Sequence, residues 1–370
     1  MSICTDLKKI RIFGVYGSFG YRQIGGTDSF FRRFCSELAK RGLRVEFILY
    51  DSPTINIEEP EPFFTVRSVA CFNDALDYLA KEDGPVLVNA VCGKDRLRFI
   101  KFRHDTKRSI CWVMVYSLLS ELWWPRFKHF IEARLYAYNG GSLCMSERLM
   151  HYVSHFDKNA RALIPPVDKL FFRSPEEKMI DGEIHVTYIG RLEEGKGAGE
   201  ALQILKGLSI DSRFKMKAVV YAFDGDVDAD AYDYDFRTIN GLDYSRRDHS
   251  GWEPMNDQIL ANVLAQTDVL LLPYRRISSS IDTPLLLLEG MASLCCCICP
   301  PLGDIPKITG LNPYLIASEN FTQNALVLLH KLDHADIKLE QKRLFKRCKE
   351  LAFGTESATD QLLSILKREV

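Results

Sequence analysis

The sequence predicts an α/β protein with two doubly wound domains, each built on a parallel β-sheet. Residues 9–50 contain a short apolar strand pattern, a loop with glycines, a helical pattern and a second strand pattern, in that order. Such a βαβ unit requires parallel strands. A second series of the same kind begins at residue 184. The chain has 370 residues, and this length accommodates two domains of roughly 150 residues each.

The first βαβ unit starts with a strand expected at residues 9–16. Apolar side chains then recur at three- and four-residue spacing, which is typical of a helix, at Phe30, Phe31, Phe34 and Leu38. Thr27 or Asp28 suits the N-cap of this helix, and Gly42 supplies its C-terminal stop. The next strand is expected at residues 43–50. Further apolar runs continue the sheet at residues 85–91, 110–116 and 142–145.

The second domain starts with a strand at residues 184–189, a loop at 190–197 and a helix at 199–207. Its other strands are expected at residues 216–223, 268–272 and 294–299, and its other helices at 258–266 and 284–293.

The domain boundary is expected where this periodicity stops. Pro165, Pro166 and a charged stretch at residues 175–181 interrupt the helical and strand patterns. We therefore expect an N-terminal domain at residues 1–165, a linker at 166–182 and a C-terminal domain at 183–357. Open parallel sheets bind ligands at the carboxyl ends of their strands, so a ligand is expected between the two domains.

Composition excludes several classes of protein. The 48 Lys and Arg residues nearly cancel the 49 Asp and Glu residues, so no overall field attracts nucleic acid, which is not expected as a partner. The longest uncharged runs, at residues 109–120 and 290–303, are shorter than the roughly 20 residues of a transmembrane helix. The N-terminus lacks a signal-peptide pattern. Because the 11 cysteines lie mostly in apolar strings, a cytoplasmic protein is expected.

Two segments are rich in residue types that bind metals. In residues 294–300 (LCCCICP), neighbouring cysteines of a strand point to opposite faces, so a buried strand is favoured over a metal site. The acidic segment at residues 224–235 has Ala229 where a calcium loop needs glycine and Asp235 where it needs glutamate. A solvated loop is therefore expected there, and Asp224 and Asp226 support no metal site.

Glycines after the first strand also suggest a dinucleotide site, at Gly14, Gly17 and Gly20. Asp51 ends the next strand, where an acid would bind a ribose. However, the glycines precede the helix by several residues, so a pyrophosphate would not meet the helix N-terminus. Tyr78 and Lys81 are one residue too close for the Tyr-x-x-x-Lys pair of an epimerase.

A stronger phosphate site is indicated in the second half. Arg191 directly follows a strand, and Lys196 and Gly197 precede a helix. Two cations beside a loop with glycines at a helix N-terminus suit a diphosphate. The alternative is two surface cations in a polar loop.

Glu289 lies within the apolar run LLLLEGMA, in the helix that Thr283 and Pro284 begin. A carboxylate in such surroundings is costly unless it accepts hydrogen bonds. Ribose hydroxyls would provide them, and a structural Lys or Arg partner is the alternative.

Short motifs follow one another through nearly the whole chain: Gly25-Gly26, Ser146-Glu147, residues 164–168 (IPPVD), Gly190-Arg191-Leu192 with Lys196-Gly197, residues 289–292 (EGMA) and residues 303–306 (GDIP). This ordered set resembles glycosyltransferase family 4, which has the GT-B architecture. The resemblance implies two Rossmann-like domains facing an interdomain cleft, with a nucleotide-sugar donor on the C-terminal domain and an acceptor on the N-terminal domain. It also implies that the last helix, within residues 358–370, packs back on the N-terminal domain.

The resemblance assigns roles by position in the C-terminal domain. Arg191 and Lys196 match the family's diphosphate-binding cations. Glu289 matches the second glutamate of its E-x7-E signature, which contacts the ribose. Ile281 stands where the first glutamate is expected, and we infer a one-residue contraction that lets Asp282 address the donor sugar.

Other positions complete the expected site. Gly190 and Thr283 belong to the expected donor site, and Gly25 and Gly26 to an acceptor or phosphate loop. The family's His-Asp pair has no counterpart, because the corresponding place has Tyr116 followed by serine.

The resemblance implies a retaining transfer, in which the leaving phosphate takes the acceptor proton, with no metal or cofactor. Preorganised cations near the leaving group favour such a transition state. Two alternatives remain. One is an NAD-dependent sugar-nucleotide epimerase or oxidoreductase, and the other is a catalytically silent GT-B binding protein, which the missing glutamate at position 281 favours.

The acceptor is expected to be a glycan or a lipid-linked glycan. Residues 118–130 combine aromatic and basic groups, with Trp123 and Trp124 at their centre, and such a mixture suits a membrane interface. This predicts peripheral contact with the inner face of a membrane. The alternative is that the tryptophans fill the N-terminal core.

Overall fold

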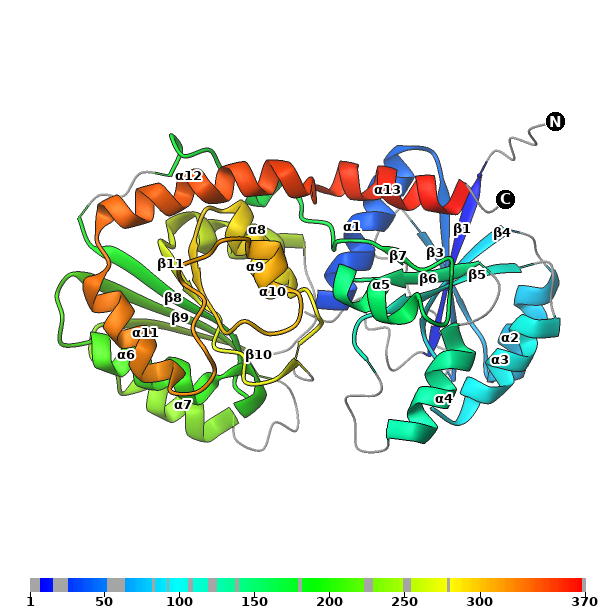
Figure 1. Ribbon diagram of the computed structural model, residues 1–370, viewed down its shortest axis with the longest axis horizontal. Helices are drawn as coiled ribbons and strands as arrows, with labels where there is room; N and C mark the ends of the chain where they lie inside the picture. The colour runs from blue at the N-terminus through cyan, green and yellow to red at the C-terminus, as the bar shows by residue number, and fades with distance from the viewer. Residues whose placement is uncertain are drawn as a thin grey trace. The chain divides into compact units, whose positions relative to one another are not determined.

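A computed structural model describes residues 7–15, 26–51, 64–81, 84–91, 93–105, 109–118, 125–136, 140–178, 182–222, 229–248, 254–277 and 280–367. The chain divides into two compact units (Figure 1). Unit 1 contains Met1–Tyr21, Thr27–Pro166 and Gly354–Val370, and unit 2 contains Arg22–Gly26 and Val167–Phe353.

Unit 1 is built on a parallel sheet whose seven described strands have the order β3-β2-β1-β4-β5-β6-β7. Its strands are β1 (Lys9–Val15), β2 (Arg44–Tyr50), β3 (Phe64–Ser68), β4 (Gly84–Ala90), β5 (Ser109–Val115), β6 (Gly141–Cys144) and β7 (Arg161–Ala162). The order reverses direction at β1, as in a doubly wound fold. Ile10 and Ile12 are buried on one face of β1 and Phe13 on the other, so both faces of the sheet are covered.

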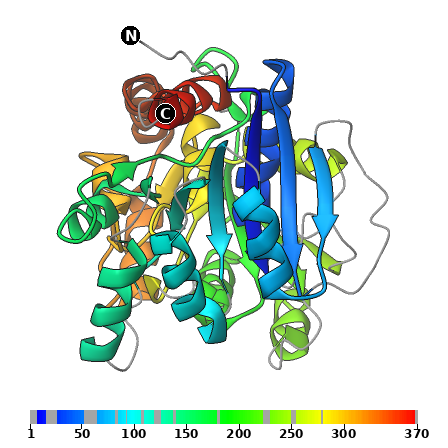
Figure 2. The ribbon, with the colours of Figure 1, turned by 90° about the vertical axis from the view of Figure 1, so that its right-hand side faces the viewer.

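Helices cover the two faces of this sheet. They are α1 (Gly26–Lys40), α2 (Phe72–Lys81), α3 (Arg96–Asp105), α4 (Pro125–Tyr136), α5 (Glu147–Val153) and α13 (Thr355–Lys367). In Figure 2, α2 and α3 lie in front of the strands. Phe72 of α2 and Phe99 of α3 share one core with Phe13. The core on the opposite face contains Phe34 of α1 and Leu362 of α13.

The last helix thus belongs to unit 1. Ala358, Leu362 and Leu366 of α13 are buried in the same core as the phenylalanines of α1. Arg41, just after α1, forms an ion pair with Asp360 and donates to the carbonyl oxygen of Glu356 at 3.0 Å. These contacts join the far end of the chain to its first βαβ unit.

The predicted helix and strands of the first βαβ unit are confirmed, with one correction at the helix start. Helix α1 begins at Gly26, so Thr27 and Asp28 lie in its first turn and not at its N-cap. Gly42 follows the helix with a φ of +79°, a conformation that costs glycine little. The sequence did not predict β3, because its alternating pattern FTVRS is short and half exposed.

Unit 2 contains a parallel sheet whose five described strands have the order β10-β9-β8-β11-β12. The strands are β8 (Ile184–Arg191), β9 (Phe214–Ala222), β10 (Leu242–Asp248), β11 (Val269–Leu271) and β12 (Cys296–Ile298). The helices are α6 (Ala198–Leu208), α7 (Ala229–Arg237), α8 (Pro254–Gln266), α9 (Leu285–Ala292), α10 (Ile305–Thr309), α11 (Phe321–Lys331) and α12 (His334–Leu351).

The expected solvated loop at residues 224–235 is wrong for its described part. Residues 229–235 lie in α7, and residues 224–228 fall outside the described residues. Phe236 is buried on one side of α7, with its ring centre 5.9 Å from that of Tyr188 and from that of Tyr244. Asp233 pairs with Arg237 one turn later, at 3.0 Å. Burial on one face and charge pairs on the other explain a helix in an acidic segment.

Residues 167–178, which the sequence assigns to a linker, pack within unit 2. Phe171 lies in a 3-10 turn, η4 (Lys169–Phe171), and is fully buried. Lys178 is also buried, and its ammonium group donates to the carbonyl oxygen of Leu264 at 3.2 Å. The segment after Pro166 is therefore part of a folded unit.

The cysteine-rich run is a buried strand, as predicted. Its cysteines are buried at positions 295, 296, 297 and 299. Burial raises the pKa of the Cys299 thiol to about 12, which disfavours the thiolate that a metal would require. Among the residues that the structure describes, His, Cys, Asp and Glu form no group of three or more that could hold a metal ion.

Candidate functional site

The candidate site lies at the carboxyl edge of the unit 2 sheet, where β8 ends in Gly190 and Arg191. A 3-10 turn, η5 (Glu194–Lys196), follows and leads through Gly197 into α6. Gly197 has a φ of +78°, and a Cβ atom there would lie 1.9 Å from the carbonyl oxygen of Pro273. Any larger residue would clash, so glycine lets this turn pack directly against the chain that leaves β11.

Lys196 is the last residue of η5 and lies directly before Gly197 in this turn. Its ammonium nitrogen lies 5.4 Å from the centre of the Tyr274 ring, which is a cation–π contact. Burial and the neighbouring Arg191 lower the pKa of Lys196 to about 8. The two cations repel each other at a helix N-terminus. An anion bound between them would remove this repulsion and is favoured there.

Arg191 is held in place by local hydrogen bonds. Its guanidinium lies 2.9 Å from the Glu193 carboxylate, and its carbonyl oxygen accepts a hydrogen bond from the Tyr188 hydroxyl at 3.1 Å. A Cβ atom at Gly190 would lie 2.7 Å from that hydroxyl, so glycine makes the Tyr188 contact possible. Gly190 therefore shapes the end of β8.

The strand register adds a residue that sequence reasoning missed. Arg191 of β8 pairs with Tyr221 of β9, and Tyr221 pairs with Arg247 of β10. In parallel strands, residues in register share a face and lie roughly 5 Å apart from strand to strand. The structure thus places Arg247 in one row with Arg191, at the edge where parallel sheets bind ligands.

Arg247 has an unusual environment. Its Nε atom is buried, and within the part of the chain that the structure describes it has no hydrogen-bond partner. Burial raises the pKa of Tyr221, Arg247 lowers it, and Glu289 and Asp257 raise it. These charged groups therefore act on one tyrosine hydroxyl. The sequence contains a clue to Arg247, because the pattern LDYSRRD has two adjacent arginines. Successive side chains of a strand point to opposite faces, so one of the two must face each side of the sheet.

Glu289 lies in α9 and is 4% exposed. A Cβ atom at Gly290 would lie 2.5 Å from the Leu270 side chain, so glycine lets α9 approach β11 closely. The Glu289 carboxylate contributes to raising the pKa of both Tyr221 and Tyr274, for which burial is the main cause. It therefore lies within electrostatic range of the Arg247 row and of the Lys196 turn.

Asp282 and Thr283 precede α9 and are buried. The Asp282 carbonyl oxygen accepts a hydrogen bond from the Asp304 amide at 3.3 Å. A Cβ atom at Gly303 would lie 3.0 Å from the Asp282 carboxylate. Among the described residues, the buried hydroxyl of Thr283 has no hydrogen-bond partner. This pair is thus fixed by the turn at Gly303, with one polar atom left to bind something else.

The remaining expected site residues lie away from this site or outside the described residues. Gly26 begins α1, whereas Gly25 falls outside the described residues, as do Trp123 and Trp124. The hydroxyl of Tyr116, which stands where glycosyltransferase family 4 has a His-Asp pair, donates to the Asn89 side chain at 2.7 Å.

Comparison with solved structures shows the fold. A sucrose-phosphate synthase from Thermosynechococcus elongatus has a TM-score of 0.71 and 15% identity, over 98% of each chain. HepE from Anabaena in complex with UDP has a TM-score of 0.72 and 11% identity, over 98% of this chain and 100% of that one. A glycosyltransferase from Rickettsia africae has a TM-score of 0.69 and 12% identity, over 98% and 99%.

The chain therefore has the α/β GT-B fold, with two Rossmann-like units. No protein-family model matches the sequence. A search of curated protein sequences finds no match either.

Proposed function

We propose that this protein is a glycosyltransferase that binds a nucleotide-diphosphate sugar on unit 2 and moves the sugar to an acceptor hydroxyl. The observation that carries the proposal is the pair of Arg191 and Lys196 at the N-terminus of α6, where burial and mutual repulsion lower the pKa of Lys196. A diphosphate is the anion whose size and charge suit two cations and a helix N-terminus. The shared fold with a UDP-bound protein supports this choice.

Each residue of the site has a role in this proposal. Arg191 and Lys196 bind the diphosphate and stabilise the charge that develops on it as the sugar leaves. Glu289 accepts hydrogen bonds from the ribose, since a carboxylate is an acceptor and the ribose hydroxyls are donors. Asp282 and Thr283 bind the donor sugar, and Gly190 lets the Tyr188 hydroxyl hold the Arg191 backbone beside the diphosphate.

We further propose that the transfer retains the anomeric configuration. The bond between the anomeric carbon and the phosphate oxygen breaks, and the bond to the acceptor oxygen forms on the same face. The acceptor proton passes to the departing phosphate oxygen. In this mechanism the two cations supply the charge stabilisation, and neither a metal ion nor a cofactor takes part.

The proposed acceptor is a glycan, in a lipid-linked form that the protein meets at a membrane surface. Phe127 and Phe130 of α4 are 59% and 55% exposed, and Leu97 of the neighbouring α3 is 60% exposed. The guanidinium of Arg134 lies 5.5 Å from the centre of the Phe130 ring. Exposed apolar groups beside cations suit the headgroup region of a bilayer. In the described part of the chain, each helix is too short or too polar to cross a membrane.

A sedimentation assay tests the membrane contact. The protein should pellet with anionic liposomes at low salt and be released as salt rises, because charges are screened within about 10 Å at 0.1 M. Phe127→Ser with Phe130→Ser should abolish pelleting while the protein stays folded, because both side chains are already exposed. Leu339→Ser, at an exposed position of α12 in unit 2, is the matched control. Pelleting that survives the phenylalanine changes would contradict this role for α4.

One experiment separates the proposed function from its alternatives. The protein is heated with UDP, GDP or NAD, and its unfolding temperature is compared with that of the protein alone. A panel of sugar nucleotides is then tested for transfer or hydrolysis. Stabilisation by UDP or GDP together with turnover supports a glycosyltransferase. Stabilisation by NAD alone would indicate an oxidoreductase, and nucleotide binding without turnover would indicate a binding protein.

A further inference from the structure

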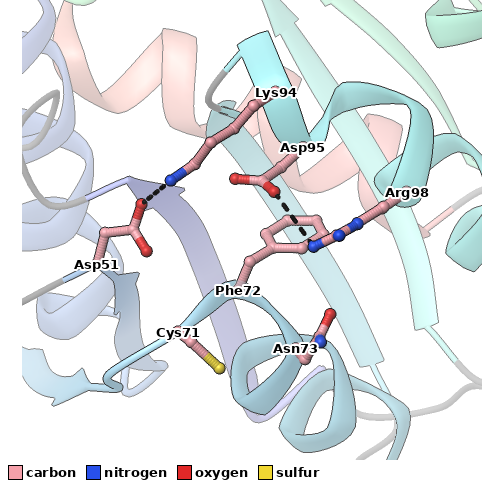
Figure 3. A pocket seen from close by; sticks show the side chains of 7 residues that line it. All are labelled: Asp51, Cys71, Phe72, Asn73, Lys94, Asp95 and Arg98. Atoms are coloured by element: carbon pink, nitrogen blue, oxygen red, sulfur yellow. Dashed lines mark ion pairs between the residues drawn. The ribbon is translucent and has the colours of Figure 1, made fainter.

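Unit 1 contains a pocket of about 230 Å³ at the carboxyl edge of its own sheet (Figure 3). Asp51 follows β2, and Lys94 and Asp95 lie in the 3-10 turn η2 (Gly93–Asp95) that follows β4. Asn73 lies in the first turn of α2, and Arg98 in the first turn of α3. Three segments, at Asp51, at residues 71–73 and at residues 94–98, thus converge on a hollow at the edge where parallel sheets bind ligands.

Asp95 is the most deeply placed of the charged groups in the pocket. Its side chain is 4% exposed, and its Oδ1 atom lies 3.9 Å from the guanidinium of Arg98, beyond hydrogen-bond range. Among the described residues its buried Oδ2 atom has no hydrogen-bond partner. Figure 3 shows this carboxyl group between Lys94 and Arg98. A buried carboxylate of this kind needs a hydrogen-bond donor, which a bound molecule can supply.

Asp51 closes the other side of the pocket. Its backbone has a φ of +53°, a conformation that is uncommon outside glycine and tends to occur at functional sites. This conformation follows directly after β2, and the Asp51 carboxylate lies 3.3 Å from the ammonium group of Lys94. The strained residue thus directs a second carboxylate to the pocket.

The charges of the pocket select the kind of ligand. Asp51 and Asp95 oppose Lys94 and Arg98, so the formal charges cancel. A phosphate would meet two carboxylates, and a metal ion would meet two cations. A sugar ring presents neutral hydroxyls, each of which donates and accepts hydrogen bonds, and so uses carboxylates, cations and the Asn73 amide together.

We propose that this pocket binds one neutral sugar residue of the acceptor glycan. The volume, smaller than a typical drug site, suits a single ring. The proposal rests on the proposed function, since it names the chemistry of the acceptor.

Cys71 provides a direct probe, because it lines the pocket and is exposed. The other described cysteines are buried, and Cys4 and Cys92 lie outside the described residues. The rate of alkylation of Cys71 by iodoacetamide can be followed in its own peptide by mass spectrometry, so that reaction elsewhere does not interfere. The probes are the methyl glycosides of glucose, galactose, mannose and N-acetylglucosamine, with inorganic phosphate and Mg²⁺ as competitors of other classes.

At least one glycoside should protect Cys71. For a dissociation constant of about 10 mM, a concentration of about 100 mM slows alkylation about tenfold by mass action. Asp95→Asn and Asn73→Ala should each remove this protection, and the second change is at an exposed position that leaves the core intact. Asp77→Asn, at an exposed position of α2 away from the pocket, should keep it.

Three outcomes would overturn the proposal: protection by phosphate or Mg²⁺ in place of the glycosides, protection by none of the four glycosides, or equal protection in Asp95→Asn. Calorimetry with UDP on the same protein separates the two proposals. If UDP binds and the glycosides do not protect, the pocket is wrongly assigned and the donor site stands. If neither UDP nor GDP binds, the proposed function itself fails.

Discussion

The Lys196 ammonium group lies 5.4 Å from the centre of the Tyr274 ring and so joins the turn before α6 to the chain that leaves β11. Tyr274 is buried. Burial raises its pKa, so the phenol stays neutral. Lys196 therefore faces an aromatic surface and the cation Arg191, while the Glu193 carboxylate offsets part of the repulsion between the two cations.

Arg191→Ala and Lys196→Ala should each reduce turnover strongly while the fold is kept. Each substitution removes a cation from the departing phosphate and should raise the barrier by about 2 to 4 kcal/mol, by analogy with the loss of one oxyanion donor. The measurement is kcat/KM with the sugar nucleotide that is turned over. Lys206→Ala, at an exposed position of α6, is the control and should leave the rate unchanged. Wild-type kinetics in both site variants would remove these cations from the mechanism.

Affinity for UDP should fall as pH rises above about 8. In the unliganded protein burial and Arg191 lower the pKa of Lys196 to about 8, so above this pH Lys196 must take up a proton when the diphosphate binds. The dissociation constant should then rise by up to about tenfold per pH unit. Calorimetry between pH 7 and pH 9.5 measures it. Lys196→Arg keeps its charge, and its affinity should stay flat over this range.

The lowered pKa of Lys196 also affects the free energy of unfolding, which should rise with pH where the affinity for UDP falls. The folded pKa lies below the value of 10.5 for an unperturbed lysine, so between these values the unfolded chain binds more protons. The contribution of Lys196 to the free energy of unfolding should therefore rise as pH increases through about 8. In Lys196→Met this increment should be absent from the pH profile of denaturant unfolding.

Glu289→Gln should weaken nucleotide binding. A charged acceptor of ribose hydroxyls becomes a neutral one, at a cost of about 1 kcal/mol or roughly fivefold in the dissociation constant. Comparison with 2′-deoxy-UDP and 3′-deoxy-UDP identifies the hydroxyl involved. Wild type and Glu289→Gln should bind with nearly equal affinity to the analogue that lacks the hydroxyl contacted by Glu289. An equal loss with every analogue would show that Glu289 acts on the fold of α9 and not on the ribose.

Arg247→Gln should weaken UDP binding and Arg246→Gln should not. Arg247 lies in register with Tyr221 and Arg191, whereas the neighbouring side chain of Arg246 pairs with Asp230 at 3.1 Å and with Asp233 at 3.4 Å. Loss of a charge-assisted contact should cost about 1.5 to 3 kcal/mol of binding free energy. Calorimetry of the two variants measures it, and equal affinities would place Arg247 outside the donor site.

Asp282→Ala should reduce transfer more than Ile281→Ala, because only the carboxylate can accept hydrogen bonds from sugar hydroxyls. Both variants should first be compared by thermal unfolding, since Asp282 packs against Gly303. Transfer rates are then measured at saturating donor. A larger defect in Ile281→Ala would contradict the inferred one-residue contraction of the E-x7-E signature.

The sequence predicted the elements whose apolar patterns are strong. The strands around Ile12 and Val186 are buried on both faces, and long apolar runs in such strands are visible without a structure. It did not predict β10, because LDYSRRD is an edge strand rich in charge. Helix α7 was missed because its acidic residues outnumber its buried ones.

The candidate sites show a similar division. Arg191, Lys196 and Glu289 lie in local motifs, so sequence alone could point to them. Arg247 enters the site through strand register, which depends on pairing between distant segments. The sugar pocket is formed by three segments between Asp51 and Arg98, and no local pattern connects them.

The position of α13 has a consequence for synthesis on the ribosome. The core of unit 1 receives Leu362 and Leu366 from the end of the chain, whereas most of unit 1 precedes Val167. At about 5 to 20 residues per second, translation of the intervening roughly 200 residues takes about 10 to 40 s. During this interval the apolar face of the unit 1 sheet beside α1 lacks the cover that α13 provides. Unit 2 can therefore complete its core before unit 1 does. A chaperone that binds apolar surface would recognise the nascent chain at this stage.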